Sequence, residues 1–196
     1  MNTLKAEKRS MDIKAKKLRR EGFVTGNVFG REMKESVPVK MDKKEVESLL
    51  KKNNTGSQVM LDVDGTKHNV LIKDIQFDPI KKQINEVDFQ ALVSNEAVHS
   101  VAEIVLVDAE KVTTGVLEEH LEEVAFKALP KDLVDKIEVN VGGMHAGDTI
   151  KVKDLDIAKN PEITLSTDPE ALIVSVTEVH ASADDEEAED GETAEA

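Results

Sequence analysis

The chain has 196 residues and a formal net charge of −14, with 39% hydrophobic and 34% charged residues, and it contains no Cys, Trp or Tyr. This length suits one large domain or two small ones, and the lack of Cys excludes a disulfide framework and any thiolate nucleophile or metal site. No stretch approaches the roughly 20 apolar residues that span a bilayer, and the first residues hold no apolar segment of signal-peptide length, so we expect a cytoplasmic protein without a membrane partner.

The charge is distributed unevenly along the chain. Residues 1–93 hold 19 Lys and Arg against 14 Asp and Glu, whereas residues 94–196 hold 7 against 26. Residues 1–20 alone carry 8 basic and 2 acidic side chains. Such an asymmetry between two halves is typical of chains that contact nucleic acid and carry an acidic tail.

The first half of the chain reads as short strands with two helices. In chain order, strands are expected at residues 3–9, 37–41, 58–63, 67–77 and 84–93, and helices at residues 14–21 and 43–52. Gly22 is expected to stop the first helix and Asp42 to cap the second. Asp64-Gly65 favours a tight hairpin, because a type I′ turn needs positive φ. These elements predict a small sheet or barrel carrying a helix.

The second half is predicted to be β-rich and acidic. Strands are expected at residues 99–108, 136–141, 149–152, 162–166 and 171–179. Residues 116–128 are ambiguous between strand and helix, and a strand pair is favoured. Residues 181–196 hold eight acidic side chains and no basic one, so we expect a disordered tail. The predicted fold class is therefore mainly β (α+β), with domains at residues 1–93 and 94–180 followed by the tail.

The strongest candidate site is a basic cluster near the N-terminus. Several cations must act together on phosphate groups to release counterions, and a short helix would place residues 16, 19 and 20 on one face with residue 17 beside it. The alternative is a solvated basic surface. The cluster consists of Arg9, Lys14, Lys16, Lys17, Arg19 and Arg20.

The histidines and phenylalanines give weaker signals. The five histidines have none of the spacings of zinc or protease sites, and the acidic run around His120 favours a solvated face over a metal cluster or a hydrolase site. Phe23 and Phe29 could stack on RNA bases, but core packing is favoured for both. We therefore expect no enzyme, with no catalytic residue, metal, cofactor or small-molecule substrate.

Short motifs in a fixed order run along almost the whole chain outside the acidic tail. They are Ala6-Glu7-Lys8-Arg9, Lys17-Leu18-Arg19-Arg20-Glu21-Gly22, Val28-Phe29-Gly30, Asp74-Ile75-Gln76, Pro79, Val87-Asp88-Phe89, Gly115-Val116-Leu117, Leu129-Pro130, Ile137-Glu138-Val139, Gly147-Asp148 and Asp154-Leu155. In these motifs the chain resembles the long form of the bacterial large-subunit ribosomal proteins that bind 5S rRNA, of the general stress protein Ctc type.

The resemblance implies a small six-stranded β-barrel that grips a 5S rRNA helix through its widened minor groove, followed by a β-rich C-terminal domain. It implies a non-enzymatic constituent of the large ribosomal subunit, or a stress-related variant of it, monomeric off the ribosome. The alternative function is a protein-interaction module with a decayed RNA surface. The implied RNA contacts are Arg9, Lys14, Lys16, Lys17, Arg19, Phe29, Gln76 and Asp88, to which the cluster and the strand alternation add Arg20 and Glu86.

The chain departs from the family pattern on this implied RNA surface. The segment between Arg9 and the basic helix is short and lacks the family's glycine, and three further departures lie at named residues. Phe29 stands where the family has Tyr, Glu86 where it has His, and Thr25-Gly26-Asn27 where it has Pro and Ala. Strand alternation places residues 86 and 88 on one side, so a carboxylate at Glu86 would approach phosphates without a partner unless a cation such as Lys82 neutralised it. These departures predict weakened RNA affinity.

Overall fold

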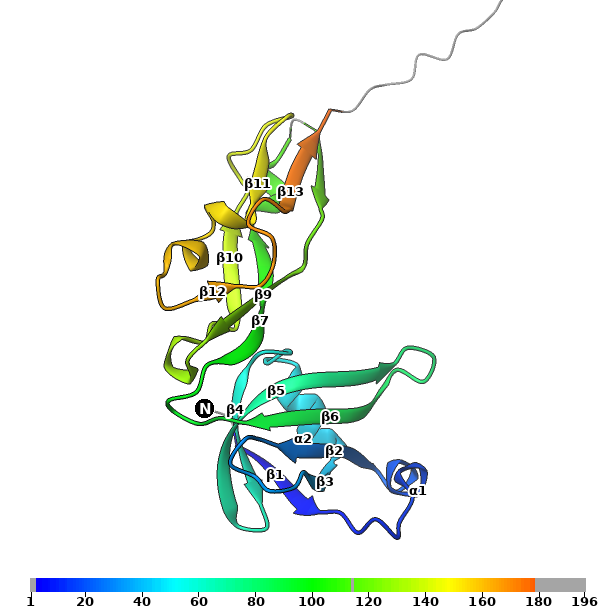
Figure 1. Cartoon of the computed structure of the whole chain (residues 1–196). Coiled ribbons are helices and arrows are strands. Elements are labelled where there is room, and N and C mark those ends of the chain that lie inside the picture. The colour runs from blue at the N-terminus through cyan, green and yellow to red at the C-terminus, as the bar shows by residue number, and fades with distance from the viewer. Residues whose placement is uncertain (1–2, 114, 179–196) are drawn as a thin grey trace, which may run out of the picture.

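The computed structural model describes residues 3–113 and 115–178, so the acidic tail predicted at residues 181–196 lies outside the described residues. Within these ranges the chain forms a closed barrel and two smaller sheets. Figure 1 shows the barrel at one end of an elongated molecule and the smaller sheets at the other. The predicted mainly β fold class, with an N-terminal six-stranded barrel and two helices, is confirmed.

The barrel consists of β1 (Thr3–Lys8), β2 (Phe23–Phe29), β3 (Val37–Asp42), β4 (Gln58–Val63), β5 (Thr66–Asp78) and β6 (Gln83–Ala91). Its strand order is β1-β3-β2-β6-β5-β4, and β1 closes the barrel by pairing in parallel with β4. The pairing of β2 with β6 is also parallel, whereas the other pairs are antiparallel. The outer parts of β5 and β6 pair only with each other and extend beyond the closed barrel as a hairpin (Figure 1).

Residues 23–29 were not predicted as a strand, yet they form β2. The segment contains Gly26 and Asn27, two residue types that are depleted in strands. A Cβ atom on Gly26 would overlap the carbonyl oxygen of Val87 on β6, so the close approach of the two strands requires glycine here. A tertiary contact, which local propensity does not report, therefore explains this strand.

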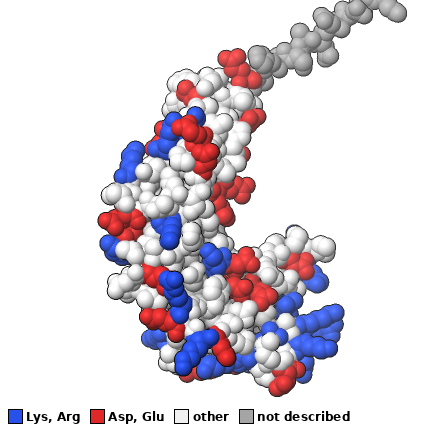
Figure 2. Space-filling model, in the orientation of Figure 1, with Lys and Arg blue, Asp and Glu red and all other residues white. Residues whose placement is uncertain are grey.

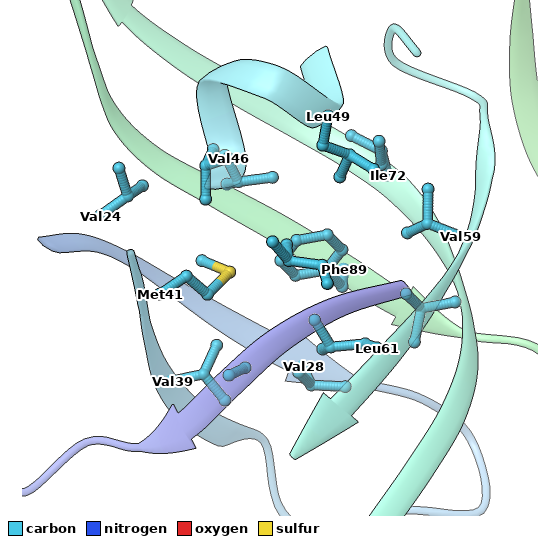
Figure 3. Packing of buried hydrophobic residues seen from close by; sticks show 14 of the residues in the cluster. Val24, Val28, Val39, Met41, Val46, Leu49, Val59, Leu61, Ile72 and Phe89 are labelled. Atoms are coloured by element: carbon cyan, nitrogen blue, oxygen red, sulfur yellow. The ribbon is translucent and has the colours of Figure 1, made fainter. Parts of the chain in front are cut away.

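Two helices lie on the barrel, α1 (Ala15–Arg20) and α2 (Lys43–Leu50). Asp42 caps α2 as predicted, because its carboxylate accepts the backbone N–H groups of Lys44 at 2.9 Å and Glu45 at 3.3 Å. The helix buries Val46 and Leu49 against the barrel core. Figure 3 shows these side chains closing over a core that also contains Val24, Val28, Val39, Met41, Val59, Leu61, Ile72 and Phe89.

The second part of the chain contains two sheets around a separate apolar core that includes Phe126. The four-stranded sheet has the order β10 (Lys136–Asn140), β7 (Val98–Val107), β9 (Glu123–Ala128), β12 (Thr164–Leu165). The three-stranded sheet has the order β11 (Thr149–Lys151), β13 (Leu172–Thr177), β8 (Val116–Glu119). Short 3-10 turns lie between the strands of this part, at Ala109–Lys111, Pro130–Asp132, Val152–Asp154 and Asp156–Lys159.

The expected pairing within residues 116–128 is wrong, although both strands exist. β8 pairs with β13, whereas β9 pairs with β7 and β12. The residues between them cross from one sheet to the other, where the His120 N–H donates to the Ile173 carbonyl and the Ile104 N–H donates to the Glu122 carbonyl, both at 2.8 Å. Alternation identifies a strand but not its partner, which explains the error.

Polar contacts join the barrel to the second part. The Ser100 hydroxyl donates to the Gly56 carbonyl at 3.3 Å, the Lys73 ammonium donates to the His99 carbonyl at 3.0 Å, and Arg31 pairs with Glu96 at 3.0 Å. The two apolar cores are separate clusters on either side of these contacts. Whether residues 1–93 fold independently stays a prediction.

Candidate nucleic-acid interface

The basic cluster begins where β1 leaves the barrel. The Arg9 backbone N–H donates to Pro38 at 2.9 Å, and its guanidinium donates to the Ile13 carbonyl at 3.1 Å, so Arg9 holds the loop that leads into α1. Lys14 is the N-cap residue of α1, and Leu18 anchors the helix in a buried position. The loop and this anchor fix the orientation of the helix, so its cations project from a defined surface.

Three cations of α1 line one groove with the tip of the β5–β6 hairpin. The groove has a volume of about 340 Å³, and its lining consists of Lys16, Arg19, Arg20, Lys81, Gln83 and Asn85. Lys17 lies beside this face with its ammonium 3.9 Å from Glu21. In Figure 2, blue side chains gather at the end of the barrel that carries α1. The helical spacing predicted the first three residues but not the hairpin residues opposite them.

A bulge brings the hairpin residues to this groove. Gln76 pairs with Glu86 and Phe77 pairs with Ile84, so Asn85 is an extra residue in β6. A bulge bends its strand and redirects the neighbouring side chains. The sequence carries no clear sign of it, because Gln83, Asn85 and the strand around them read as a continuous run.

The outer face of β5 and β6 continues from the groove along the barrel. Val87 and Phe89 are buried while Glu86 and Asp88 are partly exposed, as the alternation predicted. Exposed Gln76 lies opposite Glu86 in the register. Asp74 lies opposite Asp88, and like charges placed directly opposite each other are unfavourable unless a donor or cation offsets them. The face is therefore polar and carries carboxylates, while the cations lie on α1 and at the hairpin tip.

Asn27 on β2 organises these carboxylates, and the sequence did not single it out. Its side-chain amide donates to Glu86 at 3.3 Å and to Asp88 at 3.2 Å, and its backbone N–H donates to Asp88 at 3.0 Å. The expectation that Glu86 lacks a partner without a cation is therefore wrong. Lys82 does not fill that role, because its side chain lines a different groove beside α2.

Phe23 and Phe29 do not belong to the barrel core, so the expected core packing of both is wrong. The Lys40 ammonium lies 4.9 Å from the centre of the Phe23 ring, a cation–π contact on the barrel exterior. Phe29 is 37% exposed at the far end of β2 from α1, opposite Gln90 of β6. The implied RNA residues thus form a path from α1 along β6 to Phe29.

The described residues offer little for other kinds of site. Within residues 3–113 and 115–178, no group of three or more His, Asp or Glu side chains could hold a metal ion. His120 lies in the second part, where its Nε2 atom is 2.8 Å from the Ser175 hydroxyl. None of the helices that the structure describes has the length and apolarity needed to cross a bilayer.

The first part of the chain is thus a small closed β-barrel with a basic helix beside a polar groove. The chain belongs to the Ribosomal L25p family, whose model matches residues 4–89, and residues 97–180 match the C-terminal domain of ribosomal protein TL5. The protein is not an enzyme, because this family is a structural one.

Curated relatives extend this likeness over most of the chain. The large ribosomal subunit protein bL25 of Bacillus velezensis is 31% identical over 96% of this chain and 94% of its own length. The bL25 proteins of Finegoldia magna and Dictyoglomus thermophilum are 34% and 35% identical, each over 83% of this chain and over 77% and 81% of their own lengths. The similarity thus includes both the barrel and the second part.

Proposed function

We propose that this protein is a structural constituent of the large ribosomal subunit and binds 5S rRNA through the path from α1 along β6 to Phe29. The proposal is supported by its family and by relatives named as large ribosomal subunit proteins. The observation that carries it is the groove in which Lys16, Arg19 and Arg20 face the β5–β6 hairpin. A groove with cations on a helix and polar groups on the opposing hairpin suits a folded RNA duplex.

Each part of the path has a chemical role in this proposal. The forked guanidinium groups of Arg19 and Arg20 and the Lys16 ammonium neutralise phosphates. Gln76 and the carboxylate of Asp88 can meet 2′-hydroxyl groups or base amines in a shallow minor groove. Asn27 holds the Asp88 carboxylate in position, so this acceptor is already oriented before RNA arrives.

Replacing Glu86 with Gln is expected to tighten binding of a 5S rRNA transcript by about 1 kcal/mol, roughly fivefold. The substitution removes an anion from the RNA surface but keeps an oxygen that can accept from Asn27. Filter binding at two salt concentrations measures the effect. Glu138→Gln, an exposed position on β10, is the matched control and should leave affinity unchanged. Equal effects of both variants would show that Glu86 does not face RNA.

We also propose that residues 1–93 fold alone and carry all of the RNA-binding activity. Residues 94–180 are expected not to bind RNA. The barrel core is complete before residue 93, and positive charge is concentrated in this half. A gel shift with each half and 5S rRNA measures the difference. The first half should shift the RNA in a salt-dependent manner. A shift by residues 94–196 alone would contradict this assignment.

A further inference from the structure

The β5–β6 hairpin has a second groove, on the side of α2. It has a volume of about 440 Å³, within the range of small-ligand sites, and is lined by Glu47, Leu50, Lys51, Asn54, Ile75, Phe77, Lys82 and Ile84. Ile75 and Ile84 pack against the barrel core and form an apolar floor. Phe77, which is paired with Ile84, is 57% exposed. An aromatic face is thus open to solvent above an apolar base.

The turn at the hairpin tip is held in a defined conformation. The Asp78 carboxylate accepts the backbone N–H groups of Ile80 at 3.1 Å and Lys81 at 3.0 Å, and its other oxygen lies 3.3 Å from the Lys81 ammonium. The N–H of Lys81 is the main cause that holds the pKa of Asp78 below its usual range. Lys82 follows with a positive φ of 49°. These constraints place Lys81 in the groove beside α1 and Lys82 in the groove beside α2.

The charge and composition of the second groove indicate the class of its ligand. Lys51 and Lys82 line it against a single acid, Glu47, whose carboxylate is 3.8 Å from the Lys43 ammonium. Lysine is depleted at the cores of protein interfaces, whereas an exposed aromatic ring flanked by cations is how proteins hold unpaired nucleotides. The same hairpin already lines the proposed RNA groove on its other side.

We infer that this second groove accepts an unstacked nucleobase of RNA, which stacks on Phe77 while Lys51 and Lys82 contact the flanking phosphates. The inference rests on the proposed function and adds a single-stranded contact to a surface that otherwise suits a duplex. In this arrangement, RNA passes around the tip of the β5–β6 hairpin and contacts the groove beside α1 and the groove beside α2.

A single introduced tryptophan tests the inference, because the chain has no Trp or Tyr of its own. In Phe77→Trp, binding of a 5S rRNA transcript should quench the tryptophan fluorescence through base stacking. Leu172→Trp, a partly exposed position on β13, is the control and should keep its emission. Phe29→Trp reports on the proposed site independently.

The outcomes separate the inference from the proposed function. Quenching of Phe29→Trp without quenching of Phe77→Trp would overturn the nucleobase site and leave 5S rRNA binding intact. If the unmodified protein does not bind 5S rRNA, both the nucleobase site and the proposed function would be overturned.

Substitution chemistry distinguishes stacking from apolar docking of a protein partner. Phe77→Leu keeps an apolar side chain but removes the π face, so RNA affinity should fall about tenfold, whereas Phe77→Tyr should keep it. Equal affinity of the Leu, Tyr and unmodified proteins for RNA would overturn the inference and favour a protein partner for this groove.

Discussion

Replacing Lys16, Arg19 and Arg20 together with Ala is expected to weaken binding of a 5S rRNA transcript by on the order of a hundredfold or more. The three side chains line one groove, so they can contact neighbouring phosphates at the same time. Losing three phosphate contacts should also flatten the slope of log K against log salt by about two to three units. Filter binding over a series of salt concentrations measures both quantities.

A charge-matched control separates this site from the overall charge of the barrel. Lys5, Lys44 and Lys67 are exposed, and their replacement with Ala removes the same charge. Lys5 and Lys67 both lie beside Asp62 of β4, and Lys44 lines a groove with Lys5. This triple variant should lose little affinity. If both triple variants lose affinity equally, binding depends on net charge and α1 has no special role.

Replacing Gly56 with Ala is expected to destabilise the protein by about 3 kcal/mol or more. Gly56 has a φ of +89°, which disfavours any side chain. In addition, a Cβ atom there would overlap the carbonyl oxygen of Val101 on β7, at the junction between the barrel and the second part. Backbone has to shift to relieve this overlap. Thermal unfolding followed by circular dichroism should show the midpoint lowered by roughly 6–12 °C.

Gly65 provides a matched control for the free-energy cost of placing Ala in a left-handed backbone conformation. Its φ of +88° is nearly the same, but an added Cβ would meet nothing within 4 Å. Gly65→Ala should therefore cost only about 1–2 kcal/mol, the strain of the left-handed conformation. If the two substitutions lower the midpoint equally, then the approach of Gly56 to Val101 is not tight in solution.

Much of the barrel could be predicted from local patterns. The cap at Asp42, the Asp64-Gly65 hairpin and the alternation around Val87 and Phe89 depend on neighbours in the sequence, and each is present in the structure. Strand β2 could not be predicted, because Gly26 serves a contact with β6 that lies about sixty residues away. The partners of β8 and β9 depend in the same way on distant strands.

The candidate site likewise combines features that depend on sequence neighbours with features that depend on distant strands. Helical spacing was enough to gather Lys16, Arg19 and Arg20 on one face. The opposite wall of the groove depends on the extra residue Asn85, a bulge that has no composition signal. The role of Asn27 depends on the parallel pairing of β2 with β6, so it could be found only after the strand order was known.

In the proposed function, this protein is a constituent of the large ribosomal subunit and is held there through its barrel. The most direct measurement is sedimentation of a cell lysate on a density gradient, followed by detection of the protein across the fractions. We expect the unmodified protein to migrate with the large subunit and the triple Ala variant at Lys16, Arg19 and Arg20 to stay at the top of the gradient. Recovery of the unmodified protein only at the top, at low salt and with intact subunits, would contradict it.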